Sequence, residues 1–213
     1  MKSADDNMRN GLAVALRNEG IDWASLCQQS QQLVLFGSRA CGKDSPSADW
    51  DLLRVLLPFT AGEPRRRRRI GRIDVLEVRA DYVETHEWLH SEVANHIARY
   101  GLLLHGNDSW SSAAALGQPA VDRKLCDIRR ELDALRSVWN RIAPAFQKRR
   151  ARRLRLQLQR LGYLERIEAV PATFVLEKDW REHSKRSATG NLRRLGFGYD
   201  SSDDEIERSI LSS

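Results

Sequence analysis

The fold of this chain is decided by residues 36–52, FGSRACGKDSPSADWDL. The apolar run before Gly37 predicts a short buried strand that stops at this glycine. An Asp-x-Asp pair opens the next strand, and the period of two places Asp49 and Asp51 on the same face. Neighbouring carboxylates repel each other unless a cation lies between them, and hard oxygen ligands of this kind suit Mg²⁺.

Three further residues complete this pattern. Gly37 lets the backbone approach a phosphate, and Ser38 can donate a hydrogen bond to one. Asp74 lies inside the next predicted strand, residues 73–78, between two apolar neighbours. An acid within such a strand needs a reason, and a metal or a proton-transfer role supplies one.

The ordered set of strand, Gly-Ser, short helix, Asp-x-Asp and third Asp resembles the polymerase-β-like nucleotidyltransferase superfamily. Its ten-residue spacing is most similar to that of the minimal nucleotidyltransferases, stand-alone bacterial proteins often encoded as antitoxins beside a helical HEPN partner. Residues 91–106 are similar to the helix that follows the catalytic sheet in those proteins. The resemblance covers roughly residues 10–106, with an outer limit near 145. It implies an α/β (α+β) fold, with a small mixed sheet and flanking helices followed by helices and a basic C-terminal region.

The resemblance also implies a two-metal transfer of a nucleotide with Mg²⁺ or Mn²⁺. ATP, which would donate AMP, is the expected substrate in preference to other nucleoside triphosphates. Asp49 and Asp51 would hold the metal on the triphosphate. Asp74 would complete the metal site that activates the acceptor hydroxyl, or act as its base.

The implied nucleotide-binding residues are Gly37, Ser38, Arg39 and Lys43. Ser38 would contact the β- and γ-phosphates, and Arg39 or Lys43 would neutralise the leaving pyrophosphate. Arg39 fits a solvated turn residue equally well.

Composition and charge limit the classes of protein to which this chain can belong. The chain has 213 residues, 41% hydrophobic and 30% charged, which is ordinary for a soluble protein. No apolar run approaches the roughly 18 residues of a membrane span, and the first residues lead into no apolar signal region. Cys27, Cys41 and Cys126 are widely spaced, which fits a reducing compartment. We therefore expect a cytoplasmic protein with no membrane partner.

The charge is unevenly distributed along the chain. Residues 1–110, the expected catalytic domain, carry 14 basic and 15 acidic residues, a net charge of −1. Residues 111–213, the expected helical and basic region, carry 21 against 14, a net charge of +7. This difference indicates an acidic partner, such as nucleic acid or an acidic protein, or else a merely soluble surface.

The remaining expected elements follow from periodicity. Helices are expected over residues 5–17, 23–28, 83–104, 121–142 and 203–211, strands over 33–36 and 51–57, and a charged loop over 65–69. Residues 148–160, KRRARRLRLQLQR, suit a strand and a helix equally. With a β-hairpin within 162–176, they would form a small winged-helix-like part over 147–180. We expect a disordered tail from about residue 187, apart from its short helix.

Two arginine-rich segments are candidate contacts for RNA or an acidic partner. The first contains Arg65, Arg66, Arg67, Arg68 and Arg69. The second contains Arg149, Arg150, Arg152 and Arg153. Together they could follow an RNA backbone, whereas the alternative for the first is a solvated loop.

Two short patterns point elsewhere. Residues 86–90, HEWLH, match the zinc-protease pattern, but a surface helix explains them as well. The pairs Arg99/His105 and Arg79/His86 match the Arg-x(4–6)-His motif of HEPN ribonucleases, and two hits in one chain show how unspecific that motif is.

The acceptor is the open part of the expected function. A hydroxyl group on a partner toxin fits the family resemblance, whereas an RNA 3′ end, such as that of tRNA, fits the basic half. A cationic small molecule fits least, because it would require acidic walls. The alternative from another class is a non-catalytic protein that binds nucleic acid or a toxin.

Overall fold

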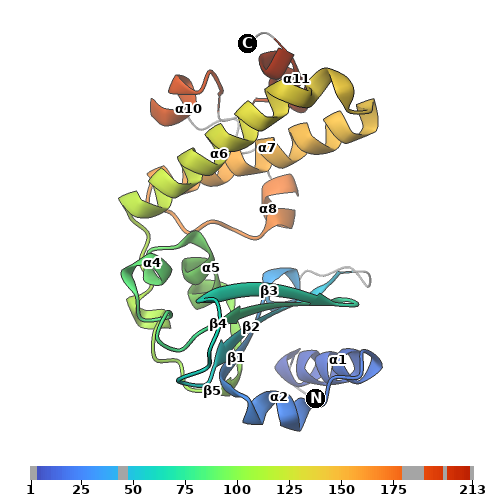
Figure 1. Ribbon diagram of the computed structural model, residues 1–213, viewed down its shortest axis with the longest axis vertical. Helices are drawn as coiled ribbons and strands as arrows, with labels where there is room; N and C mark the ends of the chain where they lie inside the picture. The colour runs from blue at the N-terminus through green and yellow to red at the C-terminus, as the bar shows by residue number, and fades with distance from the viewer. Residues whose placement is uncertain (1–3, 43–47, 179–189, 199–200, 212–213) are drawn as a thin grey trace. The chain divides into compact units, whose positions relative to one another are not determined.

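The computed structural model describes residues 4–42, 48–178, 190–198 and 201–211. The chain forms two compact units, Met1–Ala115 and Leu116–Ser213, called unit 1 and unit 2 here (Figure 1). No helix within the described residues combines the length and the apolar character needed to cross a membrane.

Unit 1 is built around one mixed sheet in the order β3-β4-β2-β1-β5. Its strands are β1 (Ser30–Phe36), β2 (Trp50–Leu56), β3 (Arg65–Ile70), β4 (Ile73–Val78) and β5 (Leu102–Gly106). Its helices are α1 (Ala4–Asn18), α2 (Trp23–Gln28), α3 (Gly37–Ala40), α4 (His86–Leu89), α5 (Glu92–Tyr100) and the 3-10 turn η1 (Ser111–Ala113). The pair β2/β4 is parallel and the other pairs are antiparallel. The expected small mixed sheet with flanking helices is thereby confirmed.

Each face of the sheet packs against helices. The cluster that includes α1 contains Leu12, Leu16, Leu33, Leu35, Leu52, Ile73 and Val75. The cluster that includes α4 and α5 contains Trp88, Ala94, Ile97, Val34, Leu53, Leu76 and Val78. Alternate residues of β2 and β4 therefore enter opposite clusters, as the period of two requires.

Two expectations for unit 1 are wrong. Residues 65–69 form strand β3 rather than a loop, and they pair with β4 along their whole length. Residues 102–104 belong to strand β5, whereas the expected helix extended to 104. Each segment lies at an edge of the sheet, where a neighbouring strand supplies the hydrogen-bonding partners that local periodicity does not reveal.

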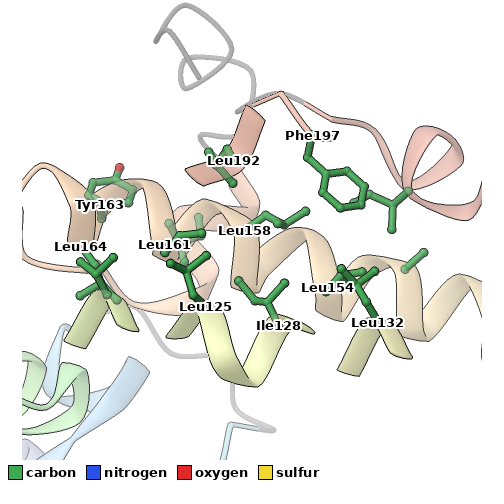
Figure 2. Close-up of a cluster of buried hydrophobic side chains, with 14 of the residues drawn as sticks. Leu125, Ile128, Leu132, Leu154, Leu158, Leu161, Tyr163, Leu164, Leu192 and Phe197 are labelled. Carbon is green, nitrogen blue, oxygen red and sulfur yellow. The ribbon is translucent and has the colours of Figure 1, made fainter. Parts of the chain in front are cut away.

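All the secondary-structure elements in the described part of unit 2 are helices. Its elements are α6 (Gln118–Val138), the 3-10 turn η2 (Trp139–Arg141), α7 (Pro144–Glu165), α8 (Thr173–Lys178), α10 (Gly190–Arg194) and α11 (Asp203–Leu211). Figure 2 shows the apolar faces of α6 and α7 meeting in its core, with Leu125 and Ile128 opposite Leu158 and Leu161. Residues 148–160, for which the sequence left strand and helix open, are part of helix α7.

The winged-helix-like expectation is wrong. Residues 162–165 continue helix α7 and residues 173–178 form α8, so no hairpin lies in 162–176. The last two residues of the range 147–180 lie outside the described residues. The disordered tail is also wrong in part, because Leu192, Phe197 and Ile206 are buried in the unit 2 core. Residues 187–189, 199–200 and 212–213 of that tail lie outside the described residues, while α11 confirms the helix expected at 203–211.

Candidate active site

The parallel pairing of β2 and β4 brings two of the predicted acids together. Asp51 is directly opposite Asp74 in the register. Because Trp50 and Leu52 enter the α1 cluster, Asp51 belongs to the other face, together with Leu53. Asp74 shares that face, and it is 19% exposed.

This crowding changes the protonation of Asp51. Burial, followed by the charges of Asp74 and Asp49, raises the pKa of Asp51 to about 6, although Arg67 and Arg69 act in the opposite direction. Desolvation and a neighbouring like charge both disfavour the ionised carboxyl. A cation placed here would reverse this effect, so the local electrostatics favour a positively charged ligand.

Gly37 fits this site through its lack of a side chain. Its φ angle is +76°, and a Cβ atom there would lie 2.3 Å from Oδ2 of Asp51. Any other residue would be strained and would collide with the carboxylate. The Gly-Ser turn therefore packs directly against Asp51, with Ser38 next in helix α3. Lys43 lies outside the described residues.

Arg39 holds the loop that leads into Asp49. Its Nη2 and Nε donate to the carbonyl oxygen of Ala48, at 2.8 and 3.2 Å. Its guanidinium lies 4.1 Å from the centre of the Trp50 ring, a cation–π distance. Arg72 Nη2 also donates to the Ala48 oxygen at 2.9 Å. These contacts position the Asp-x-Asp segment, and the predicted contact of Arg39 with pyrophosphate stays a prediction.

Two arginines of β3 pair with the predicted metal ligands, a pairing that was not expected from the sequence. Arg67 Nε lies 3.0 Å from Oδ1 of Asp74, and Arg69 Nη2 lies 2.9 Å from Oδ2 of Asp49. No signal in the sequence reveals this pairing, because it depends on the antiparallel register of β3 on β4, which places Arg67 and Arg69 on the same face as Asp74.

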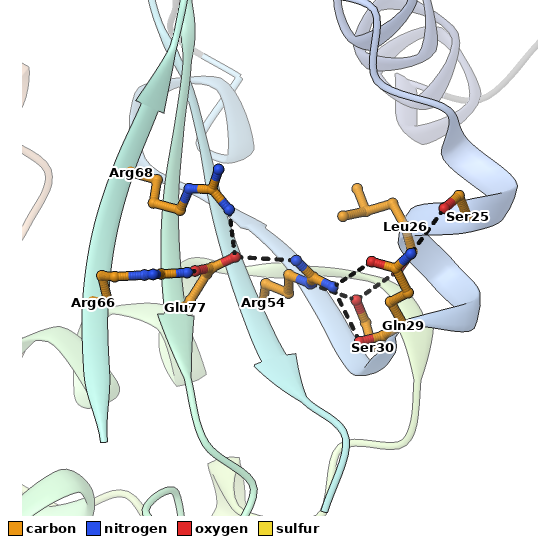
Figure 3. A network of polar contacts seen from close by, with 8 residues as sticks. All are labelled: Ser25, Leu26, Gln29, Ser30, Arg54, Arg66, Arg68 and Glu77. Atoms are coloured by element: carbon orange, nitrogen blue, oxygen red, sulfur yellow. Dashed lines mark hydrogen bonds and ion pairs between the residues drawn. The ribbon is translucent and has the colours of Figure 1, made fainter. Parts of the chain in front are cut away.

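Two other arginines of β3 contact a buried acid on the opposite face. Glu77 is only 4% exposed, and Figure 3 shows Arg54, Arg66 and Arg68 around it. Their closest distances to its carboxylate are 3.0, 2.6 and 3.7 Å, respectively. Arg54 also donates to the side chain of Ser30. This network compensates the desolvation of Glu77 and ties β2, β3 and β4 together.

Asp49, Asp51 and Asp74 have the oxygen ligands that a divalent cation prefers, but the three carboxylates do not point to a common centre in the structure. Among the residues described, no three His, Cys, Asp or Glu side chains are grouped closely enough to hold a metal ion. Oδ1 of Asp74 is buried and, although ion-paired with Arg67, lacks a well-formed hydrogen bond. Mg²⁺ or Mn²⁺ would compete with the ion pairs that Asp49 and Asp74 make with Arg69 and Arg67.

The other candidate residues lie elsewhere in unit 1. His86 belongs to the short helix α4 and His90 follows it, and their rings are tilted against each other with centres 4.0 Å apart. Arg99 belongs to α5 and His105 to β5.

The basic residues of α7 are largely engaged in ion pairs. Arg150 and Arg153 pair with Glu131 of α6, and Arg152 pairs with Glu177 of α8. The nucleic-acid contacts predicted for this segment and for β3 stay predictions.

Comparison with known proteins identifies no family for the chain. No family description matches it, and no curated protein matches it. A crystal structure described as that of a nucleotidyltransferase-like protein from Exiguobacterium sibiricum aligns with 13% sequence identity, over 93% of this chain and 74% of that one. The TM-score of that superposition is 0.37. A functional assignment therefore depends on the residues of this chain.

Proposed function

We propose that unit 1 is a divalent-cation-dependent nucleotidyltransferase. The observation that carries this proposal is the register that sets Asp51 beside Asp74, with Gly37 packed against the Asp51 carboxylate. Asp49 lies two residues before Asp51, so a third carboxylate is close to the same edge. Carboxylate oxygens combined with substrate phosphates form the ligand set that Mg²⁺ prefers.

Asp49, Asp51 and Asp74 are the residues that would hold Mg²⁺ or Mn²⁺. When bound, the ion would offset the charge of the triphosphate and lower the pKa of the acceptor hydroxyl. Ser38 would donate its hydroxyl to a phosphate oxygen, and Gly37 leaves room for the approach of that phosphate.

The acceptor that we propose is a hydroxyl group on a partner protein, with ATP as the donor of AMP, as in an antitoxin that modifies its toxin. An RNA 3′ end is the second candidate, favoured by the net charge of +7 in residues 111–213. The ion pairs of Arg150, Arg152 and Arg153 weigh against RNA, because they use cations that phosphates would need.

Labelled nucleotides test this function. ATP, CTP, GTP and UTP, each labelled at the α-phosphate, are offered with Mg²⁺ to the neighbouring gene's product and to total tRNA. We expect label from ATP on the protein, lost with EDTA and with Asp51→Asn. Label on tRNA would instead identify RNA as the acceptor. If neither acceptor is labelled, and if neither EDTA nor Asp51→Asn changes the affinity for nucleotide, unit 1 is a non-catalytic binding protein.

A further inference from the structure

Strand β3 distributes four of its arginines by alternation between acids on its two faces. Arg66 and Arg68 reach Glu77 on one face, whereas Arg67 and Arg69 reach Asp74 and Asp49 on the other. The strand thus presents two guanidinium groups at the candidate active site.

The two faces differ in how firmly their ion pairs are held. On the Glu77 side the acid is 4% exposed and also binds Arg54, which is itself 14% exposed. On the active-site side, Arg67 and Arg69 are 60% and 62% exposed, and their partners Asp74 and Asp49 are 19% and 36% exposed, both more than Glu77. Ion pairs whose guanidinium is this exposed are weaker and exchange more readily than buried ones.

The chemistry of these pairs points to an exchange of partners. A divalent cation on a carboxylate weakens the ion pair of that carboxylate with a guanidinium, because the two cations repel each other and compete for the same negative charge. A released guanidinium needs a new anion, and its planar array of donors matches phosphate oxygens. The triphosphate of the nucleotide would bring such oxygens to the same edge of the sheet.

We propose that Arg67 and Arg69 are ligand-exchanging residues of the nucleotide site. They neutralise Asp74 and Asp49 before substrate binds, and they transfer to the triphosphate when the divalent cation takes the carboxylates. This inference rests on the proposed function and assigns the phosphate-binding role to β3.

Binding measurements on the whole chain test this exchange, with Mn²⁺ alone and ATP·Mg²⁺ as the two probes. In Arg67→Gln/Arg69→Gln, we expect Mn²⁺ affinity, measured by electron paramagnetic resonance, to rise about three- to tenfold, because two weak competitors are removed. Calorimetry should show ATP·Mg²⁺ affinity falling by about tenfold or more, because charge-assisted hydrogen bonds to phosphate are lost.

Arg68→Gln is the matched control. It removes the same charge from the same strand at similar exposure, but its guanidinium faces Glu77 at 3.7 Å. We expect both affinities to stay within about twofold of the unmodified chain, which is the scale expected for a screened, distant charge. The single variants Arg67→Gln and Arg69→Gln should each show part of the effect, so the test survives if the double variant folds poorly.

Failure of this inference can be told apart from failure of the proposed function. If Asp51→Asn weakens both Mn²⁺ and ATP binding while the Arg67 and Arg69 variants behave like Arg68→Gln, the exchange is refuted and the metal site stands. If Asp51→Asn changes neither affinity, the proposed function falls and the exchange falls with it.

Discussion

Replacing Asp51 by Asn should stabilise the metal-free protein while it abolishes transfer. Burial and neighbouring acids raise the pKa of Asp51 from its ordinary 3.8 to about 6. In the folded protein at neutral pH the ionised carboxyl of Asp51 therefore lowers the free energy of unfolding. The amide of Asn, which has the same shape and no charge, does not. A residue that serves a cation is expected to be costly when the cation is absent.

The size and the pH dependence of the effect follow from the two pKa values. The difference between 3.8 and about 6 corresponds to about 3 kcal/mol at neutral pH. Because the folded-state pKa is the higher one, the stability that this group contributes is complete below pH 3.8 and is lost as the pH rises through about 6. Asp51→Asn lacks this loss, so its advantage should grow as the pH rises from about 4 to about 6, stay constant above that range and be absent below pH 3.8.

Hydrogen exchange is the assay that isolates unit 1, because unfolding of the whole chain would mix two units. The slowest amides of β2 and β4 report the free energy of opening, measured in EDTA at pH 7.5 and at pH 4.5 after correction for intrinsic rates. We expect the free energy of opening of the Asp51→Asn variant to exceed that of the unmodified chain by about 1–3 kcal/mol at pH 7.5, the upper value being the full electrostatic cost.

Glu77→Gln is the control on the opposite face of β4. Its carboxylate compensates Arg54, which is 14% exposed, so removing that charge should destabilise unit 1 by about 3 kcal/mol. An Asp51→Asn variant that is equally or less stable than the unmodified chain at pH 7.5, with an unchanged pH profile, would refute the electrostatic account of the site.

Three other predictions concern the same site and the basic segments. Gly37→Ala should destabilise unit 1 by about 1–3 kcal/mol, a strained-backbone cost, and should weaken ATP·Mg²⁺ binding in calorimetry because its Cβ displaces Asp51. Unchanged binding would remove the turn from the site. Asp74→Asn should stay folded and bind nucleotide, with transfer reduced by about a hundredfold or more in the labelling assay; full transfer would show that the third carboxylate is assigned wrongly. If residues 148–155 bind RNA, the affinity in filter binding should fall steeply between low and physiological salt, and a nearly constant affinity would exclude RNA as the partner.

The sequence alone determined those parts of the protein that depend on neighbours along the chain. The apolar run ending at Gly37 and the alternation around Asp51 and Asp74 located β1, β2 and β4, because the period of two is a local property. The same alternation places Asp74 and Glu77 on opposite faces of β4. Charge and apolar spacing similarly located α11, residues 203–211.

Only the tertiary structure decided the rest. Five identical residues have no period to read, so the strand at Arg65–Arg69 exists because β4 offers a free edge, and its register chose which acid each arginine meets. β5 formed for the same reason, against the free edge of β1. The aliphatic and basic run of α7 became a helix because its buried face packs against α6. Pairing and burial between segments distant in sequence supply these free energies, and no local window of sequence contains them.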